Sequence, residues 1–225
     1  MRRRLTAALV MLAATAVLTA GGSPAIAGDL GVINELQAAV ASSEATVTTT
    51  VTPLTPTYSP ELQKYLATLS ASERTEFLRQ NIPTSEEVTL TVRPMTAAET
   101  ATLDLQPTLA SRKCWVSRAD AAKKNDVGAK VYTYYHVTRW CVLGGTRIEG
   151  ADRVDYGGQP KVYGWRYEGS YRSDEGVVSN QGRAYTQHEF TFRVGPWDIQ
   201  QDLPCLRVTG MPNGTATWSK KCGIY

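Results

Sequence analysis

The four cysteines constrain this chain more than any other feature of its sequence. The stretch from Cys114 to Cys222 holds all four of them, together with all five tryptophans. Because the chain also begins like an exported protein, four cysteines predict two disulfides, and three pairings are possible. We expect Cys114–Cys141 and Cys205–Cys222, since each pair brackets two strands predicted to be neighbours. On the loop-entropy account each bond would stabilise the fold by roughly 3–4 kcal/mol.

An export signal is predicted at residues 1–27. Arg2, Arg3 and Arg4 form a basic start, Leu5 to Ala20 form a short apolar run, and Ala25-Ile26-Ala27 matches a cleavage site. The run is too short for a comfortable membrane span. The expected location is therefore extracellular, with no membrane attachment after cleavage. An uncleaved signal anchor is the alternative.

Removing this signal removes the apparent basicity of the chain. The sequence has 24 basic and 21 acidic residues, and three of the arginines lie in the signal, so 24 − 3 leaves 21 against 21. A neutral mature chain argues against nucleic acid as a partner. The remaining charge is divided: residues 28–112 are net acidic and residues 113–225 net basic. The basic half could face an anionic wall polymer, or the surface could simply be mixed.

Residues 28–112 are predicted to be a helix-rich, Thr/Pro-rich N-terminal region. Asp29 can cap a short helix that runs to Val40. Ser59-Pro60 is a good helix start, and Ser70 with Glu73 matches a capping box, with Pro83 ending that helix. A partly disordered spacer is the alternative reading of this region.

A short repeat lies within this region. Residues 47–55 resemble residues 88–96, with six of nine positions identical. Each copy reads as a strand that a proline stops, and Val88, Leu90 and Val92 alternate with polar residues as in a half-buried strand. The copies could be a duplicated helix–strand unit whose strands pair, or convergence on common turn chemistry.

Residues 113–225 are predicted to form an all-β antiparallel domain. Alternating segments are expected at 113–117, 130–143, 146–154, 161–171, 182–194, 206–210 and 215–219. Residues 119–129 read as a charged loop or helical turn, 157–160 as a turn and 173–176 as a loop. The overall expectation is an α+β protein whose C-terminal part is a β-sandwich stapled by two disulfides.

The last hairpin contains a conflict of register. A turn at Pro212-Asn213-Gly214 with glycine in the left-handed position places Val208 opposite Trp218. A two-residue Asn-Gly turn instead places Cys205 opposite Cys222. The two registers differ by one residue, which exchanges the faces of all side chains, and the sequence leaves both open.

An aromatic stripe is the sharpest candidate site. By strict alternation Tyr163, Trp165, Tyr167 and Tyr171 share one face of a strand. Tyr132, Tyr134, His136 and Trp140 share a face of another. Exposed aromatic rings stack on sugar rings, but large aromatic side chains lie more often in a core. The first set is therefore a candidate ligand-stacking surface with a core face as its alternative.

Catalytic and cofactor motifs are missing from the sequence. His188-Glu189 is not followed by a second histidine, and no nucleophile elbow, phosphate loop or calcium loop is present. The cysteine spacings fit neither a redox pair nor a zinc site. His188 is in phase with Phe190 and Phe192, which favours a core histidine. We therefore predict no catalytic residue, no metal ligand and no cofactor.

One pattern resembles a known group of proteins. Cys114-Trp115 and Trp140-Cys141-Val-Leu-Gly-Gly-x-x-Ile148, with the later aromatic strand, are similar to a pattern in small secreted proteins of high-GC Gram-positive (actinobacterial) bacteria. The resemblance covers residues 114–225. It implies secretion and a β-rich fold, and it assigns no activity and no site.

These observations favour a non-catalytic binding module outside the cell, with a glycan or wall polymer as its ligand. The alternative is an exported protein-binding factor such as an inhibitor or a toxin-like effector. A hydrolase without a recognisable motif is the third hypothesis, and it requires two carboxylates, or a histidine and a nucleophile, to converge in one pocket.

Overall fold

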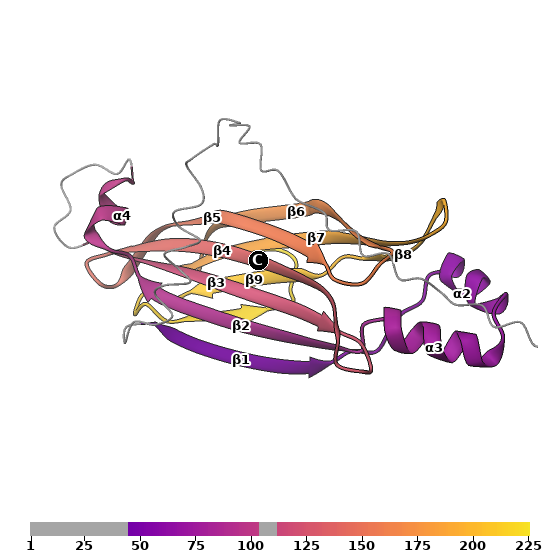
Figure 1. Cartoon of the computed structure of the whole chain (residues 1–225). Coiled ribbons are helices and arrows are strands. Elements are labelled where there is room, and N and C mark those ends of the chain that lie inside the picture. The colour runs from indigo at the N-terminus through magenta and orange to yellow at the C-terminus, as the bar shows by residue number, and fades with distance from the viewer. Residues whose placement is uncertain (1–44, 104–111) are drawn as a thin grey trace, which may run out of the picture.

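The computed structural model describes residues 45–103 and 112–225, and it shows two antiparallel five-stranded sheets packed together (Figure 1). The signal at 1–27 and the helix expected from Asp29 lie outside the described residues. The first sheet has the order β1-β2-β3-β4-β5, and the second has the order β10-β9-β7-β6 with β8 also paired to β7. The strands are β1 (Thr46–Pro53), β2 (Ser85–Pro94), β3 (Arg112–Lys124), β4 (Lys130–Leu143), β5 (Arg147–Pro160), β6 (Trp165–Val178), β7 (Gln181–Val194), β8 (Trp197–Asp202), β9 (Cys205–Gly210) and β10 (Ala216–Ser219).

Both expected disulfides are confirmed. Cys114 on β3 lies directly opposite Cys141 on β4, with their Cα atoms 4.1 Å apart. Cys205 at the start of β9 bonds Cys222, which follows β10, across a Cα–Cα distance of 5.5 Å. The first bond therefore joins two neighbouring strands, and the second joins β9 to the segment that follows its neighbour β10.

The short helices begin where the sequence predicts. In α2 (Pro60–Ala67) the Ser59 hydroxyl accepts from the Leu62 amide, and in α3 (Ala71–Asn81) Ser70 and Glu73 form the expected capping box. A third helix, α4 (Ala97–Ala101), has a similar box. Figure 1 shows α2 and α3 at one end of the sandwich and α4 at the other. Ser59 binds α2 to β8, because its amide donates to the Gln200 side chain (2.9 Å) and its hydroxyl to the Ile199 carbonyl.

The described part of 28–112 contains two strands beside its helices, because the two repeat segments are strands of the first sheet. β1 pairs antiparallel with β2, and β2 pairs with β3 along its length. The side chains of Val88, Leu90 and Val92 are buried in the core, as their alternation predicts. This sheet therefore extends across the predicted boundary at 112/113, and the repeat does place its two strands side by side.

Several strands are longer than expected. β3 continues through 119–124, where a loop or helical turn was predicted, and β6 continues through the predicted loop at 173–176 to a turn at Ser179-Asn180. The glycines at 157–158 lie inside β5 and not in a turn. A Cβ at Gly157 would lie 2.7 Å from the Tyr135 ring, and one at Gly158 2.7 Å from the Phe190 ring. These glycines therefore allow close approach of aromatic rings, a role that sequence alone does not separate from a turn.

The last hairpin adopts the first of the two registers. Val208 lies opposite Trp218, and Gly214 has a φ of +88° in the turn. β10 ends at Ser219, so Cys222 reaches Cys205 from the segment beyond the strand. The pairing of Val208 with Trp218 and the Cys205–Cys222 bond are therefore compatible, because Cys222 need not lie directly opposite Cys205 on a paired strand.

Trp140 occupies the centre of the core between the two sheets. Its side chain is fully buried, and its indole N–H donates to the Met211 carbonyl at 3.1 Å. A Cβ at Gly210 would overlap its ring, and one at Gly182 would lie 3.0 Å from its Cβ. Glycines on β7 and β9 thus make the space for this indole.

Candidate functional site

The four residues of the predicted aromatic stripe lie in different environments. Tyr163 is 99% exposed, Trp165 is 4% exposed, Tyr167 is half-buried and Tyr171 is 46% exposed. Tyr163 belongs to the turn before β6, where Gly164 has a φ of +94°. Bulges at 167–169 and 170–172 then interrupt the register of β6 with β7. The four side chains therefore do not form one continuous stacking face.

Trp165 is part of the core, and the half-buried Tyr167 packs against the core. The Trp165 indole N–H donates to the Asn81 carbonyl at the end of α3 (2.9 Å). The Tyr167 hydroxyl lies 3.1 Å from Nδ1 of His188, and burial is the main cause that raises the pKa of Tyr167 to about 12. Their rings pack on Phe192 and Phe190 respectively, with centroids 5.4 and 5.0 Å apart.

An open depression remains beside Tyr163, with a volume of about 690 Å³. Trp165 and Phe192 are buried residues of its lining, and Val162 and Val194 are half-buried ones. The Arg193 amide donates to the Gly164 carbonyl at 2.8 Å. This bond holds the Tyr163 turn beside the end of β7. We call this feature the tip depression.

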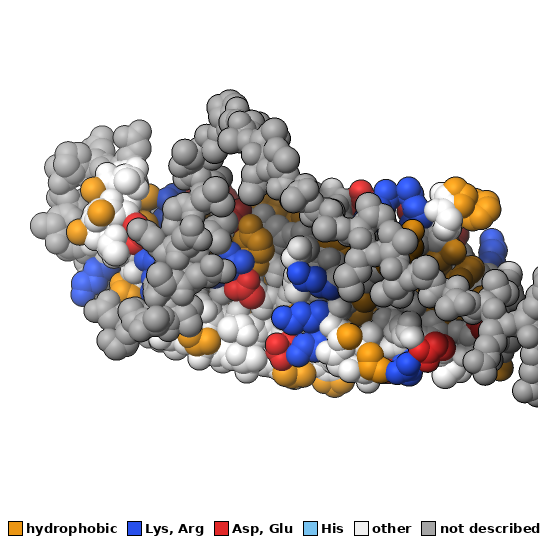
Figure 2. All heavy atoms as spheres, in the orientation of Figure 1, with side chains coloured by type: hydrophobic (Ala, Val, Ile, Leu, Met, Phe, Trp, Pro, Cys, Tyr) orange, Lys and Arg blue, Asp and Glu red, His pale blue; other side chains and the backbone are white. Residues whose placement is uncertain are grey.

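Trp197 is a second exposed aromatic residue; it does not line the tip depression but follows its lining residue Gly195 by two positions, and no sequence motif singles it out. It is the first residue of β8 and is 71% exposed. A Cβ on Gly195, which lines the depression, would lie 4.0 Å from the Trp197 ring. Figure 2 shows hydrophobic side chains gathered at the tip where β7 turns into β8. The only sequence signal was the preceding turn, Gly195-Pro196, which places the next residue at a loop tip.

Charged groups border the tip depression. Arg193 binds Asp198 through two hydrogen bonds of 2.8 and 3.0 Å, and Arg166 lies 2.9 Å from Glu168. The hydrogen bond from Arg193 is the main cause that lowers the pKa of Asp198. Lys161 also lines the depression. The border therefore offers guanidinium and ammonium donors beside the carboxyl groups of Asp198 and Glu168.

The aromatic face of β4 is part of the core. Tyr132, Tyr134, His136 and Trp140 are all at most 2% exposed. His136 contacts the hydroxyls of Thr186 (2.9 Å) and Thr138 (2.6 Å) through its two ring nitrogens. Nε2 of the buried His188 has no hydrogen-bond partner among the described residues. Burial is the main cause that lowers the pKa of each histidine to about 3, so both are neutral at ordinary pH.

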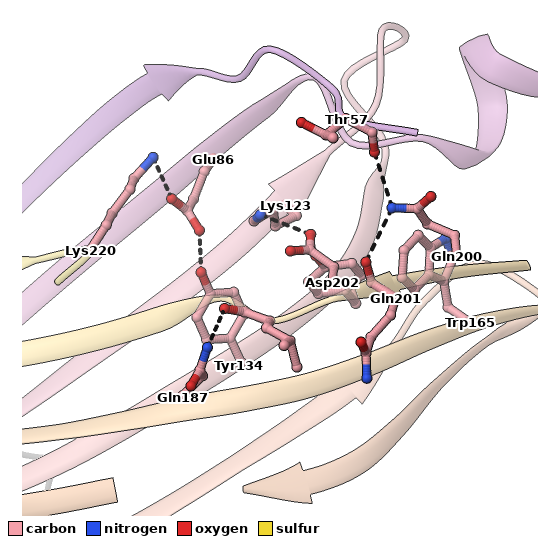
Figure 3. A network of polar contacts seen from close by, with 12 residues as sticks. Thr57, Glu86, Lys123, Tyr134, Trp165, Gln187, Gln200, Gln201, Asp202 and Lys220 are labelled. Atoms are coloured by element: carbon pink, nitrogen blue, oxygen red, sulfur yellow. Dashed lines mark hydrogen bonds and ion pairs between the residues drawn. The ribbon is translucent and has the colours of Figure 1, made fainter. Parts of the chain in front are cut away.

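A polar network joins the two sheets near β4 (Figure 3). Glu86 on β2 accepts a hydrogen bond from the Tyr134 hydroxyl and lies 2.6 Å from the Lys220 ammonium group. Asp202 on β8 accepts from the Tyr132 hydroxyl and, at 2.9 Å, from Lys123. No local sequence pattern predicts this pairing, because the partners are 48 to 134 positions apart.

The chemistry of this network fits a structural role, in which it holds the two sheets together. Burial raises the pKa of Tyr132 and of Tyr134 well above 10, and the neighbouring carboxylates add to the shift. Both phenols are therefore neutral donors and not nucleophiles. Glu86 belongs to the first sheet and pairs with Lys220, which follows β10 of the second sheet. Asp202 belongs to the second sheet and pairs with Lys123 of the first. Each carboxylate thus ties one sheet to the other.

Metal ligation finds no support in the described parts of the chain, where no group of three or more His, Cys, Asp or Glu side chains is placed to hold an ion. Among the helices of those parts, none is both long and apolar enough to cross a membrane. Comparisons with protein-family models, with curated proteins and with solved structures found no match.

Proposed function

We propose that this chain is a secreted, non-catalytic module that binds a glycan or wall polysaccharide at the tip depression. The observation that carries the proposal is the exposure of Tyr163 (99%), which lines a depression with an apolar floor, together with the exposure of Trp197 (71%), two residues after Gly195 of the same lining. Large aromatic side chains left in water at one place are typical of ligand sites, since the surface they expose is unfavourable until a ligand covers it. The C–H face of a sugar ring suits such a surface.

The charged border fits the same ligand class. Arg166, Arg193 and Lys161 supply N–H donors that can bind hydroxyl or carboxylate oxygens of a polymer. The carboxylate of Asp198 is held ionised by Arg193 and so can accept from sugar hydroxyls. An ionised, ion-paired carboxylate does not supply the proton that a glycosidase acid must donate, which favours binding over hydrolysis.

The test is sedimentation of the oxidised protein with insoluble polysaccharides, including peptidoglycan. We expect Trp197→Ala and Tyr163→Ala each to lower the affinity by about tenfold or more, since about 1.4 kcal/mol of stacking corresponds to a factor of ten. Tyr171→Ala is the matched control, because Tyr171 is exposed but lies further along β6, where two bulges interrupt the strand, and is not adjacent to any residue of the depression's lining. Wild-type protein that stays in the supernatant with every polymer, or equal losses in all three variants, would refute the proposal.

A further inference from the structure

β1 is an edge strand with an unusual composition. Its one neighbour among the described residues is β2, so its other edge has no paired strand there. Its sequence, TVTTTVTP, contains no charged residue, and Val47 and Val51 are 47% and 61% exposed. In Figure 1 β1 forms the lower border of the molecule, and Figure 2 shows hydrophobic side chains along that border. Edge strands of soluble proteins usually carry charges or bulges that prevent pairing, and β1 has neither.

Two backbone hydrogen bonds show which groups of β1 point to the open edge. The amide of Leu54, the residue after β1, donates to the Thr84 carbonyl just before β2 at 2.8 Å, so an even-numbered residue faces β2. The amide of Met95, the residue after β2, donates to the Cys114 carbonyl of β3 at 2.8 Å, so the odd-numbered residues of β2 face β3 and its even-numbered residues face β1. In an antiparallel ladder the direction of the backbone groups alternates along a strand. The even-numbered residues of β1 therefore bond β2. The N–H and C=O groups of Val47, Thr49 and Val51 point away from it.

The sequence of β1 is a palindrome about Thr49. Residues 46–52 read Thr-Val-Thr-Thr-Thr-Val-Thr in either direction. If two copies of β1 pair antiparallel around a two-fold axis at Thr49, Val47 of one copy lies opposite Val51 of the other. All three residues with outward backbone groups then fall in hydrogen-bonded positions, which gives about six hydrogen bonds. A symmetric dimer requires such self-complementarity, whereas a peptide from another protein does not.

From this we infer that β1 is a dimer interface, through which two copies of the chain join their first sheets into one continuous sheet. The opposed valines lie on the outer face of that sheet, because Val47 and Val51 are partners of Thr91 and Glu87, which alternate with the core residues of β2. Aliphatic cross-strand pairs stabilise such a ladder, and no like charges oppose each other within it. Pro53, which lacks an N–H, ends the ladder.

Cysteine cross-linking tests both the interface and its register. In the full chain, Thr49→Cys places two sulfur atoms opposite each other at the axis, within the range of a disulfide. We expect it to form a covalent dimer under mild oxidation. Val47→Cys alone should not, because the two copies of position 47 are offset by four residues, about 14 Å. A mixture of Val47→Cys and Val51→Cys proteins should cross-link.

Sedimentation equilibrium supplies the second measurement. The unmodified chain should show a concentration-dependent dimer, and Thr49→Lys should be monomeric because it opposes two ammonium groups at the axis. Thr217→Lys, at an exposed position of β10, is the control and should leave the dimer unchanged. A monomer at all concentrations, or cross-linking of Val47→Cys as efficient as that of Thr49→Cys, would overturn the inference.

Discussion

Acid sensitivity of the fold follows from its two buried histidines. His136 and His188 are fully buried, and they are the only histidines in the sequence. Burial holds both pKa values at about 3 in the folded state, with the positive charge of Arg153 adding to the shift. In the unfolded chain a histidine has a pKa near 6.5. The unfolded state therefore binds more protons than the folded state between about pH 6.5 and pH 3, and stability falls as the pH is lowered through this window.

The magnitude depends little on the folded pKa values themselves. At pH 5.5 an unfolded histidine with a pKa of 6.5 is about nine-tenths protonated, which stabilises the unfolded state by about 1.4 kcal/mol. Any folded pKa below about 4.5 leaves this figure unchanged. Two histidines give a loss of about 3 kcal/mol between pH 7.5 and pH 5.5. Carboxylates add little in this interval, because their unfolded pKa values lie near 4.

The assay is urea unfolding of the oxidised chain, followed by tryptophan fluorescence at the two pH values. His188→Phe should halve the pH-dependent loss to about 1.4 kcal/mol, whatever its effect on stability at pH 7.5. A phenyl ring suits the site because His188 packs against Tyr134 and Tyr167, with ring centroids 5.0 and 5.9 Å away. Thr217→His, which adds an exposed histidine, should leave the loss near 3 kcal/mol. Equal unfolding free energies at both pH values, or a full loss in His188→Phe, would refute the reasoning.

Three further predictions concern stability and are measured by the same urea unfolding at pH 7.5. Tyr134→Phe should lower the free energy of unfolding by about 1–3 kcal/mol, because Glu86 then loses a buried donor; Tyr171→Phe, at an exposed position, should change it little. Gly214→Ala should destabilise by more than about 1 kcal/mol, because the residue has a φ of +88° and the added Cβ would overlap the Trp115 indole. Replacing both Cys114 and Cys141 by alanine should cost about 3.5 kcal/mol by loop entropy, and an unchanged unfolding midpoint would contradict it.

Features set by local rules were predictable from the sequence. A serine before proline, or a serine three residues before glutamate, satisfies the free amides of a helix start without help from distant residues. Ser59 and Ser70 therefore mark α2 and α3 correctly. The disulfide pairing was also within reach, because each cysteine pair brackets segments that alternate like neighbouring strands. The burial of Val88, Leu90 and Val92 followed from the same alternation.

Features set by distant partners were not predictable in this way. Gly157 and Gly158 look like turn residues, and only the rings of Tyr135 and Phe190 show why glycine is needed inside a strand. The same holds for Glu86, whose two partners, Tyr134 and Lys220, come from β4 and from beyond β10. A pattern read along one segment carries no information about which segment faces it.

The candidate site shows where alternation stops being a guide. Parity placed Tyr163 and Trp165 on one face, but a strand face exists only where the backbone is extended, and the left-handed Gly164 separates the two residues. One side chain consequently points to solvent and the other to the core. The stacking hypothesis now rests on Tyr163 with Trp197, since Tyr171 lies beyond two bulges of β6.

The palindrome in β1 is a sequence pattern whose meaning depends on the position of the strand in the sheet. The letters Thr-Val-Thr-Thr-Thr-Val-Thr are visible in the sequence, but their symmetry has no consequence in a strand with neighbours on both sides, where β-branched residues serve only the ladder. It acquires one in β1, which pairs with β2 on one side and presents Val47, Thr49 and Val51 on the other. The same seven residues in a central strand would predict no partner. Because β1 lies at the edge of the sheet, its palindromic sequence predicts a specific, symmetric contact between two copies of the chain, and a single cysteine can test the register of that contact.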